Sequence, residues 1–180
     1  IFIINPPVVR DSLVIVAPAT AGPAPGQSST GGTGVQPGPA APRWGPLGDH
    51  RYYVEEDLAV IELSGGAFSL ADSQMLIDTV ESIQNRFGYY LLLGDITRGI
   101  SLTSAVRRQI ADWSTRYRPN SVTALVGARL PARAALTLAL GAMRLLGRDN
   151  HKTEFFPELE AGLKWLHSQR EYAAQRRTAR

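Results

Sequence analysis

The sequence has no cysteine and only three histidines among its 180 residues. Without cysteine the chain has no disulfide framework, no cysteine nucleophile, no CxxC redox site and no thiolate metal ligand. The histidines are His50, His151 and His167, and none has a second histidine at the spacing of a metal-binding motif. We therefore expect neither a metal site nor a cofactor.

Charged residues and long hydrophobic runs are also scarce. Charged residues make up 19% of the chain, where about a quarter is usual, and the formal net charge is +3. The positive surplus is spread over many arginines, so nucleic acid is not an expected partner. No apolar run reaches the roughly 18 residues of a membrane-spanning helix. Because Arg10 and Asp11 interrupt the first apolar stretch, a signal peptide matches poorly, and we expect a cytoplasmic protein.

The first 48 residues differ in composition from the rest of the chain. They hold nine of the twelve prolines and eight of the seventeen glycines. Over about 18–43 the chain has too little apolar surface to offset the entropy of ordering it, so we expect a flexible linker there. Residues 1–17 are more apolar, and we expect a disordered or weakly docked arm, with two short strands as the alternative. Arm and linker together occupy 1–48.

From residue 49 onward the hydrophobic pattern is regular and predicts one folded domain over 49–180. Ser69 and Asp72 have the spacing of a capping box at a helix start, and Gly88 is a typical residue to end that helix. Strands are expected at 50–55, 58–64, 89–93, 122–126 and 152–156, and helices at 69–87, from Ser101 or Thr103 to 117, at 131–147 and from 157 onward, with a fraying end over 169–180.

The expected order of elements is therefore β-β-α-β-α-β-α-β-α. Strands separated by helices pair in parallel through right-handed crossovers, and the opening hairpin adds an antiparallel edge. The sequence thus predicts an α/β domain with a mixed sheet, preceded by the proline- and glycine-rich arm.

Three stretches of the domain match a known family in character and order. They are LAVIELSGG at 58–66, LLLGDITRGISLTSAVRR at 91–108 and EFFPELEAGLKWL at 154–166. Together they resemble the STAS family, the fold of bacterial anti-sigma factor antagonists, and its SpoIIAA-like relatives, over about 49–168. The resemblance implies a non-enzymatic regulatory module that docks another protein through the loop and helix at 97–113. It also implies the partner class, which is a kinase-like anti-sigma factor or a sigma-regulatory protein.

The regulatory signature of that family is partly present. It consists of an aspartate, a hydrophobic residue and Ser or Thr, then a short loop and Asp-Ser-Ser-Gly at a helix start. Asp95, Ile96 and Thr97 match the beginning. Ser104 takes the first serine position, and Ala105 takes the second, which the family usually phosphorylates. Thr103 stands in place of the acid and Val106 in place of the glycine, so the signature supports the resemblance in fold and leaves control by a kinase open.

The loop at 97–105 also suggests a chemistry of its own. Ser101, Thr103 and Ser104 lie at an expected helix N-terminus, where unpaired backbone N–H groups and the helix dipole favour an anion. All three hydroxyls are candidate phosphorylation sites, because a phosphate there would change the charge of a partner-facing surface. The alternative is that one hydroxyl only caps the helix.

The expected partner-binding residues surround these hydroxyls. Three arginines, Arg98, Arg107 and Arg108, are placed to pair with a phosphate at Ser104. The alternative is that they are simply solvated. Asp95 is expected to hydrogen-bond the loop amides rather than to act in catalysis, because no second acid or base lies near it in the sequence. The partner-binding set is Asp95, Thr97, Arg98, Arg107 and Arg108.

Two functional classes are considered first. An enzyme is the third class, because the sequence shows no set of residues with the spacing of a catalytic site. The first is the interaction module. The alternative is a small-ligand or lipid binder similar to the SEC14 group, with a pocket beside the apolar helix expected over 134–146. A cavity of about 300 Å³ or more would favour the binder. Neither class fixes the oligomeric state.

Overall fold

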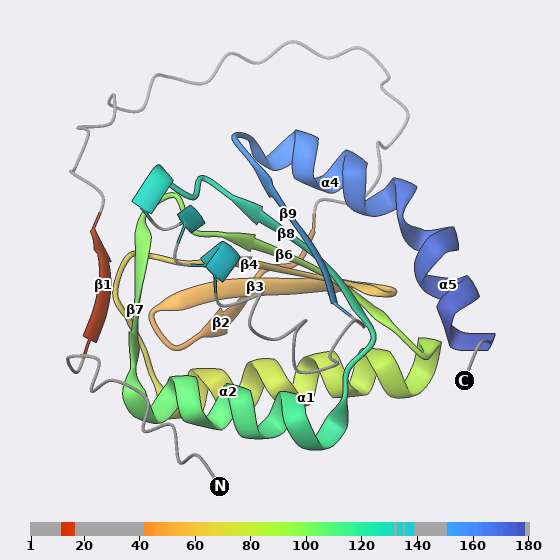
Figure 1. Cartoon of the computed structure of the whole chain (residues 1–180), viewed down its shortest axis with the longest axis horizontal. Coiled ribbons are helices and arrows are strands. Elements are labelled where there is room, and N and C mark those ends of the chain that lie inside the picture. The colour runs from red at the N-terminus through yellow and green to blue at the C-terminus, as the bar shows by residue number, and fades with distance from the viewer. Residues whose placement is uncertain (1–11, 17–41, 132, 135, 139–150, 179–180) are drawn as a thin grey trace, which may run out of the picture.

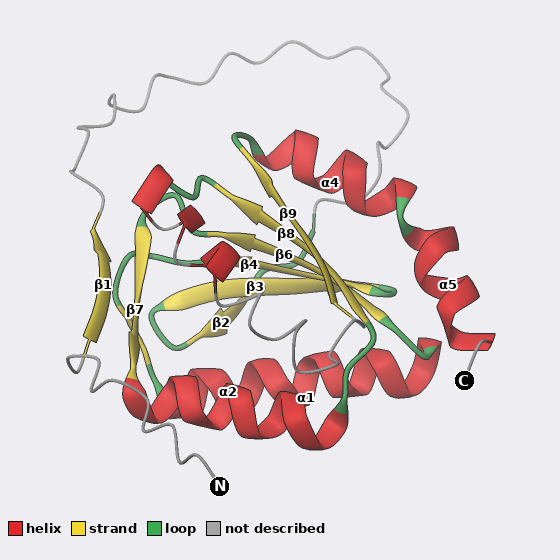
Figure 2. Ribbon diagram, viewed as in Figure 1, coloured by secondary structure: helices red, strands yellow, loops and turns green. Residues whose placement is uncertain are grey.

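The structure, a computed structural model, describes residues 12–16, 42–131, 133–134, 136–138 and 151–178. Strands and helices alternate along most of this range (Figures 1 and 2). In chain order the elements are β1 (Ser12–Val16), β2 (Gly45–Leu47), β3 (His50–Glu55), β4 (Leu58–Glu62), β5 (Ala67–Phe68), α1 (Leu70–Phe87), β6 (Tyr90–Asp95), β7 (Gly99–Thr103), α2 (Ser104–Tyr117), β8 (Ser121–Val126), β9 (His151–Phe156), α4 (Leu159–Ser168) and α5 (Arg170–Thr178).

A six-stranded sheet in the order β2-β3-β4-β6-β8-β9 forms the centre of the fold. β4, β6, β8 and β9 pair in parallel, whereas β2 and β3 add antiparallel strands at one edge. The prediction of an α/β domain with a mixed sheet and an opening hairpin is confirmed. A second sheet of three strands, in the order β1-β7-β5, was not predicted.

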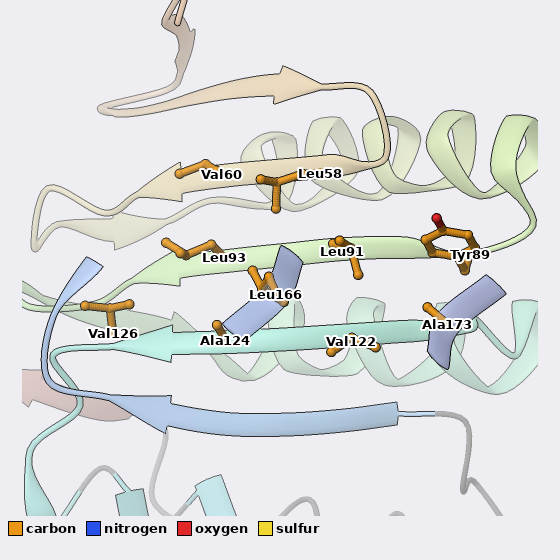
Figure 3. Packing of buried hydrophobic residues seen from close by; sticks show 10 residues of the cluster. All are labelled: Leu58, Val60, Tyr89, Leu91, Leu93, Val122, Ala124, Val126, Leu166 and Ala173. Atoms are coloured by element: carbon orange, nitrogen blue, oxygen red, sulfur yellow. The ribbon is translucent and has the colours of Figure 1, made fainter. Parts of the chain in front are cut away.

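Helices cover both faces of the six-stranded sheet (Figure 2). Alternate residues of a strand point to opposite faces, so Leu91 and Leu93 of β6 pack with Leu166 of α4 on one side (Figure 3). On the other side, Tyr90 of β6 packs with Val80 of α1. The central strand is therefore buried on both faces, as parallel strands usually are.

The predicted ends of α1 are confirmed. The Ser69 hydroxyl accepts a hydrogen bond from the Asp72 amide at 3.1 Å, and the Asp72 carboxylate accepts one from the Ser69 amide at 2.8 Å. Gly88 ends the helix in the left-handed region, with φ of +81°. The helix expected at 131–147 is helical at the described positions from 130 to 138, and the remainder of it lies outside the described residues.

The boundary expected at residue 49 is wrong, because the sheet begins earlier. β2 pairs with β3, and its Leu47 is only 1% exposed. Trp44 packs edge-on against Tyr53, with ring centroids 4.7 Å apart. Further upstream, β1 pairs with β7, so part of the arm forms a strand. The linker expected over 18–43 lies, apart from its last two residues, outside the described part of the chain.

The expected fraying of residues 169–180 is also corrected, because most of this segment forms α5. Arg170 donates to buried Asp57 at 3.0 Å from Nε, and its second nitrogen lies 2.9 Å from the same carboxylate oxygen. Tyr89 donates to the other oxygen at 2.8 Å. Burial and this hydrogen bond raise the pKa of Tyr89 to about 12, so the phenol keeps the proton it donates. Ala173 of α5 is buried on the sheet.

Removing residues 1–41 should leave a domain that unfolds cooperatively, because the three apolar clusters of the fold are formed by residues from Leu47 onward. Removing residues 1–48 should lower the free energy of unfolding by a further ~2 kcal/mol or more, because this deletion also removes the buried Leu47. Thermal and urea unfolding measure both. A non-cooperative transition after the shorter deletion would show that β1 is needed for the core.

Arg170→Ala should lower the free energy of unfolding by about 3 kcal/mol, because it leaves the Asp57 carboxylate buried without its cation. Adding Asp57→Asn should recover part of that loss, since it removes the unpaired charge. Lys164→Ala, at an exposed position of α4, is the control and should change stability by less than about 0.5 kcal/mol. Equal effects of Arg170→Ala and Lys164→Ala in urea unfolding would contradict this account.

Candidate functional site

Asp95 ends β6 and shapes the turn that follows it. Its Oδ1 accepts a hydrogen bond from the Thr97 amide at 2.9 Å. The Ile96 amide donates to the carbonyl of Val126 at 3.0 Å, which ties the turn to the end of β8. The expected structural role of Asp95, binding a loop amide, is therefore confirmed.

Two glycines hold this turn in one place. Gly127 has a φ of +74°, and a Cβ there would overlap the Thr97 side chain. Gly65 has a φ of +91°, and a Cβ there would lie 2.6 Å from the carbonyl oxygen of Arg98. Both positions need glycine for its conformation and for its size. The backbone of residues 97–98 is thus clamped between the ends of β4 and β8.

The segment after the turn is a strand rather than the expected loop. Residues 99–103 form β7, which pairs with β5 on one side and β1 on the other. Ser101 lies within it and is half-buried. The alternation of Gly99, Ile100, Ser101, Leu102 and Thr103 is the signal that could have indicated a strand, since apolar residues recur every second position.

The hydroxyls at the start of α2 have different surroundings. Thr103 is the N-cap, and its side chain accepts a hydrogen bond from the Val106 amide at 3.3 Å. Of the two caps expected, the structure therefore selects Thr103 and not Ser101. Ser104 is the first residue of the helix and is exposed. Thr103 is exposed as well, but its hydroxyl oxygen accepts the cap hydrogen bond.

The structure divides the predicted partner-binding residues into two groups. Asp95, Thr97 and Arg98 lie at the carboxyl end of β6, whereas Arg107 and Arg108 lie in the first turns of α2. β7 separates the groups, and an extended segment from residue 98 to residue 104 spans about 20 Å. Arg98 therefore does not share a site with Ser104, which corrects the expectation that all three arginines pair with a phosphate there.

The two predicted partner-binding arginines of α2 also differ from each other. Arg107 is half-buried and donates to the carbonyl oxygen of Leu102 at 2.7 Å, so it fastens the helix to the end of β7. Arg108 is exposed and stands four residues after Ser104, on the same side of the helix. A phosphate at Ser104 would lie at the positive end of the helix dipole and beside Arg108.

α2 has a large accessible surface. Val106 and Ser114 are its two buried residues among fourteen. A groove of about 350 Å³ lies between α2 and α1. In it, Trp113 donates to Glu81 at 2.7 Å and stacks on Tyr117, with ring centroids 5.8 Å apart. The groove is lined by both polar and aromatic side chains, which sequence reasoning did not predict because they come from two helices.

An apolar cavity of about 190 Å³ lies beneath β7. Its walls come from the sheet, α1, α2 and the helical residues from 130 to 138. Residues that line it include Leu63, Phe68, Ile100, Leu102, Ile110 and Leu136. Its volume is below the roughly 300 Å³ at which ligand pockets begin, which was the size expected for a binder.

Two histidines pair with serines inside the fold. His50 is 4% exposed, and its Nδ1 accepts a hydrogen bond from the Ser64 amide at 3.1 Å. His151 Nδ1 lies 2.6 Å from Ser121 Oγ, across β8 and β9. Ser121 is 2% exposed, so its hydroxyl does not meet solvent. Both pairs join neighbouring elements of the fold.

Comparison with known proteins gives no further assignment. No family model matches the chain, and no curated protein matches it. Within the described ranges, no helix combines the length and apolar character needed to cross a membrane. The same part of the chain has no cluster of three or more His, Asp or Glu side chains placed to hold a metal ion.

Ser104→Asp should leave the free energy of unfolding within about 0.5 kcal/mol of the native value, because Ser104 is exposed and an acid is favourable at a helix N-terminus. Thr103→Ala should cost about 1 kcal/mol, because it removes the N-cap. Urea unfolding of the two variants measures both. A larger loss from Ser104→Asp than from Thr103→Ala would contradict the exposed position of Ser104.

Proposed function

We propose that the chain is a non-enzymatic regulatory module of the STAS type, which binds another protein through α2 and the strand that leads into it. The observation that carries the proposal is the exposure of α2, which buries two of its fourteen residues and borders an open groove with α1. A helix with one narrow buried face leaves the rest of its surface for a partner.

The charge of this surface indicates the kind of partner. Residues 104–118 carry four arginines and one aspartate. Opposite charges across an interface speed association and exclude wrong partners, so an acidic protein surface fits this helix. By the family resemblance, the partner is a kinase-like anti-sigma factor or a sigma-regulatory protein.

Ser104 would supply the control. Its exposed hydroxyl stands in the first turn of α2, close to Arg108 in sequence and on the same side of the helix. A phosphate there would bring −1.5 to −2 charges into a basic surface. It would neutralise part of the attraction for an acidic partner, so phosphorylation would release that partner.

Two groups of a kind that enzymes use, a carboxylate at a strand end and a serine beside a histidine, have structural contacts. Asp95 binds the Thr97 amide, and the Ser121 hydroxyl is buried against His151. These contacts shape the turn and join two strands. They support a role in binding rather than turnover.

Binding of a small apolar ligand is the second candidate. The observation in its favour is the cavity of about 190 Å³, whose lining residues are apolar apart from one glycine. This volume suits a fragment of a lipid chain better than a whole lipid, so we place the interaction module first. A lipid that stays with the full chain in native mass spectrometry would reverse this order.

Changing Arg107 and Arg108 to Glu together should weaken partner capture at least tenfold, because it reverses two charges of the docking helix. The full-length chain serves as bait in an extract of its own cells, and mass spectrometry identifies the proteins it enriches. Capture should also weaken as salt is raised, since exposed charges are screened.

Arg43→Glu with Lys164→Glu is the matched control. Both residues are exposed and lie outside α2 and β7, and the pair changes the net charge by the same amount. Circular dichroism confirms that both double variants are folded. Equal capture by the two variants would refute docking through α2.

A further inference from the structure

The strand β1 lies along the whole length of β7 (Figure 1). The pairing is antiparallel and runs from Ser12 opposite Thr103 to Val16 opposite Gly99. β1 is the outer strand of the three-stranded sheet, because β7 has β5 as its other neighbour. The N-terminal arm thus covers the strand that leads into the proposed docking helix.

The covered edge of β7 has the properties of a site for an extended peptide. A strand edge offers a row of backbone N–H and C=O groups that pair with any suitable strand. Ile100 and Leu102 of β7 line the apolar cavity, and the register places Ile15 and Leu13 opposite them. The segment that occupies the edge is the apolar sequence SLVIV.

The connection between β1 and β2 is long and rich in proline and glycine. Residues 17–44 join β1 to β2, and twelve of these 28 residues are proline or glycine. This composition predicts a flexible linker, and a flexible chain of that length has an end-to-end distance of roughly 30 Å, which would give a tethered strand a local concentration in the millimolar range. At that concentration β1 would compete with a strand of another protein for the edge of β7 without excluding it.

We propose that the edge of β7 is a docking site for an extended apolar strand of the partner, and that β1 is a tethered internal occupant of this site. The inference rests on the proposed function, because it names how the partner reaches the β7–α2 surface and what covers that surface beforehand. The same pairing puts Ser101 and Thr103 in register with Val14 and Ser12, so release of β1 would free the backbone edge of the segment that holds both hydroxyls.

The test uses full-length chains and a labelled peptide with the sequence of residues 10–17, RDSLVIVA. One chain is native. The second carries Leu13→Pro and Val14→Pro. Neighbouring residues of a strand point their N–H groups to opposite sides, so one of the two prolines removes a donor that faces β7. The third, as control, carries Ala21→Pro and Ala24→Pro in the segment that is already rich in proline.

Fluorescence anisotropy should show saturable binding of the peptide to the Leu13→Pro, Val14→Pro chain. Binding to the native chain and to the control should be at least tenfold weaker, because their own β1 occupies the edge. Hydrogen exchange should show that the peptide restores protection of amides within 99–103. A peptide with the same two prolines should not bind.

Equal binding of the peptide to all three chains, or binding to none of them, would overturn the proposal. If the native chain forms a dimer that the Leu13→Pro, Val14→Pro change abolishes, the occupant is β1 of a second copy, and the partner-strand proposal is wrong. Thermal unfolding confirms that the variants are folded. The peptide assay contains no partner, so its outcome is separate from that of the capture experiment. If the peptide binds but the Arg107→Glu, Arg108→Glu chain captures its partner unaltered, the α2 docking surface is rejected and the β7 site is kept.

Discussion

Burial of β6 on both faces is the constraint on which the rest of the structure depends. Leu91 and Leu93 have no measurable exposure, and they pack against the α4 side while Tyr90 packs against α1. Packing on both faces fixes the position of the carboxyl end of β6. Asp95 stands at that end, and the glycines at 65 and 127 then leave one path for the chain that follows.

That path explains why the candidate site differs from the one the sequence suggests. After the turn at 96–98 the chain runs as β7 away from the strand ends before α2 begins. The signature residues near Asp95 and the hydroxyl of Ser104 are therefore at opposite ends of a strand. We therefore propose α2 and β7 as the docking surface, and Asp95 contributes only by fixing the turn that precedes β7.

Features with local causes were predictable from the sequence, and features with distant partners were not. The capping box at Ser69, the glycine end of α1 and the alternation of buried strands depend on residues within a few positions. The alternation over 99–103 is a local signal for β7, but the pairing of this strand was not predictable, because its outer neighbour, β1, lies almost 90 residues earlier in the chain. α5 was missed because Asp57, the carboxylate that holds Arg170, is 113 residues away, and its pattern alone is that of a polar, exposed end.

The β1–β7 pair links the arm to the proposed docking surface. Nuclear Overhauser effects in the full-length chain test this pairing most directly, because antiparallel strands bring backbone protons of opposite residues close together. We predict cross-strand effects between residues 12–16 and 99–103 in the register that places Ile15 opposite Ile100. Random-coil shifts for 12–16, with no cross-strand effect to β7, would contradict it.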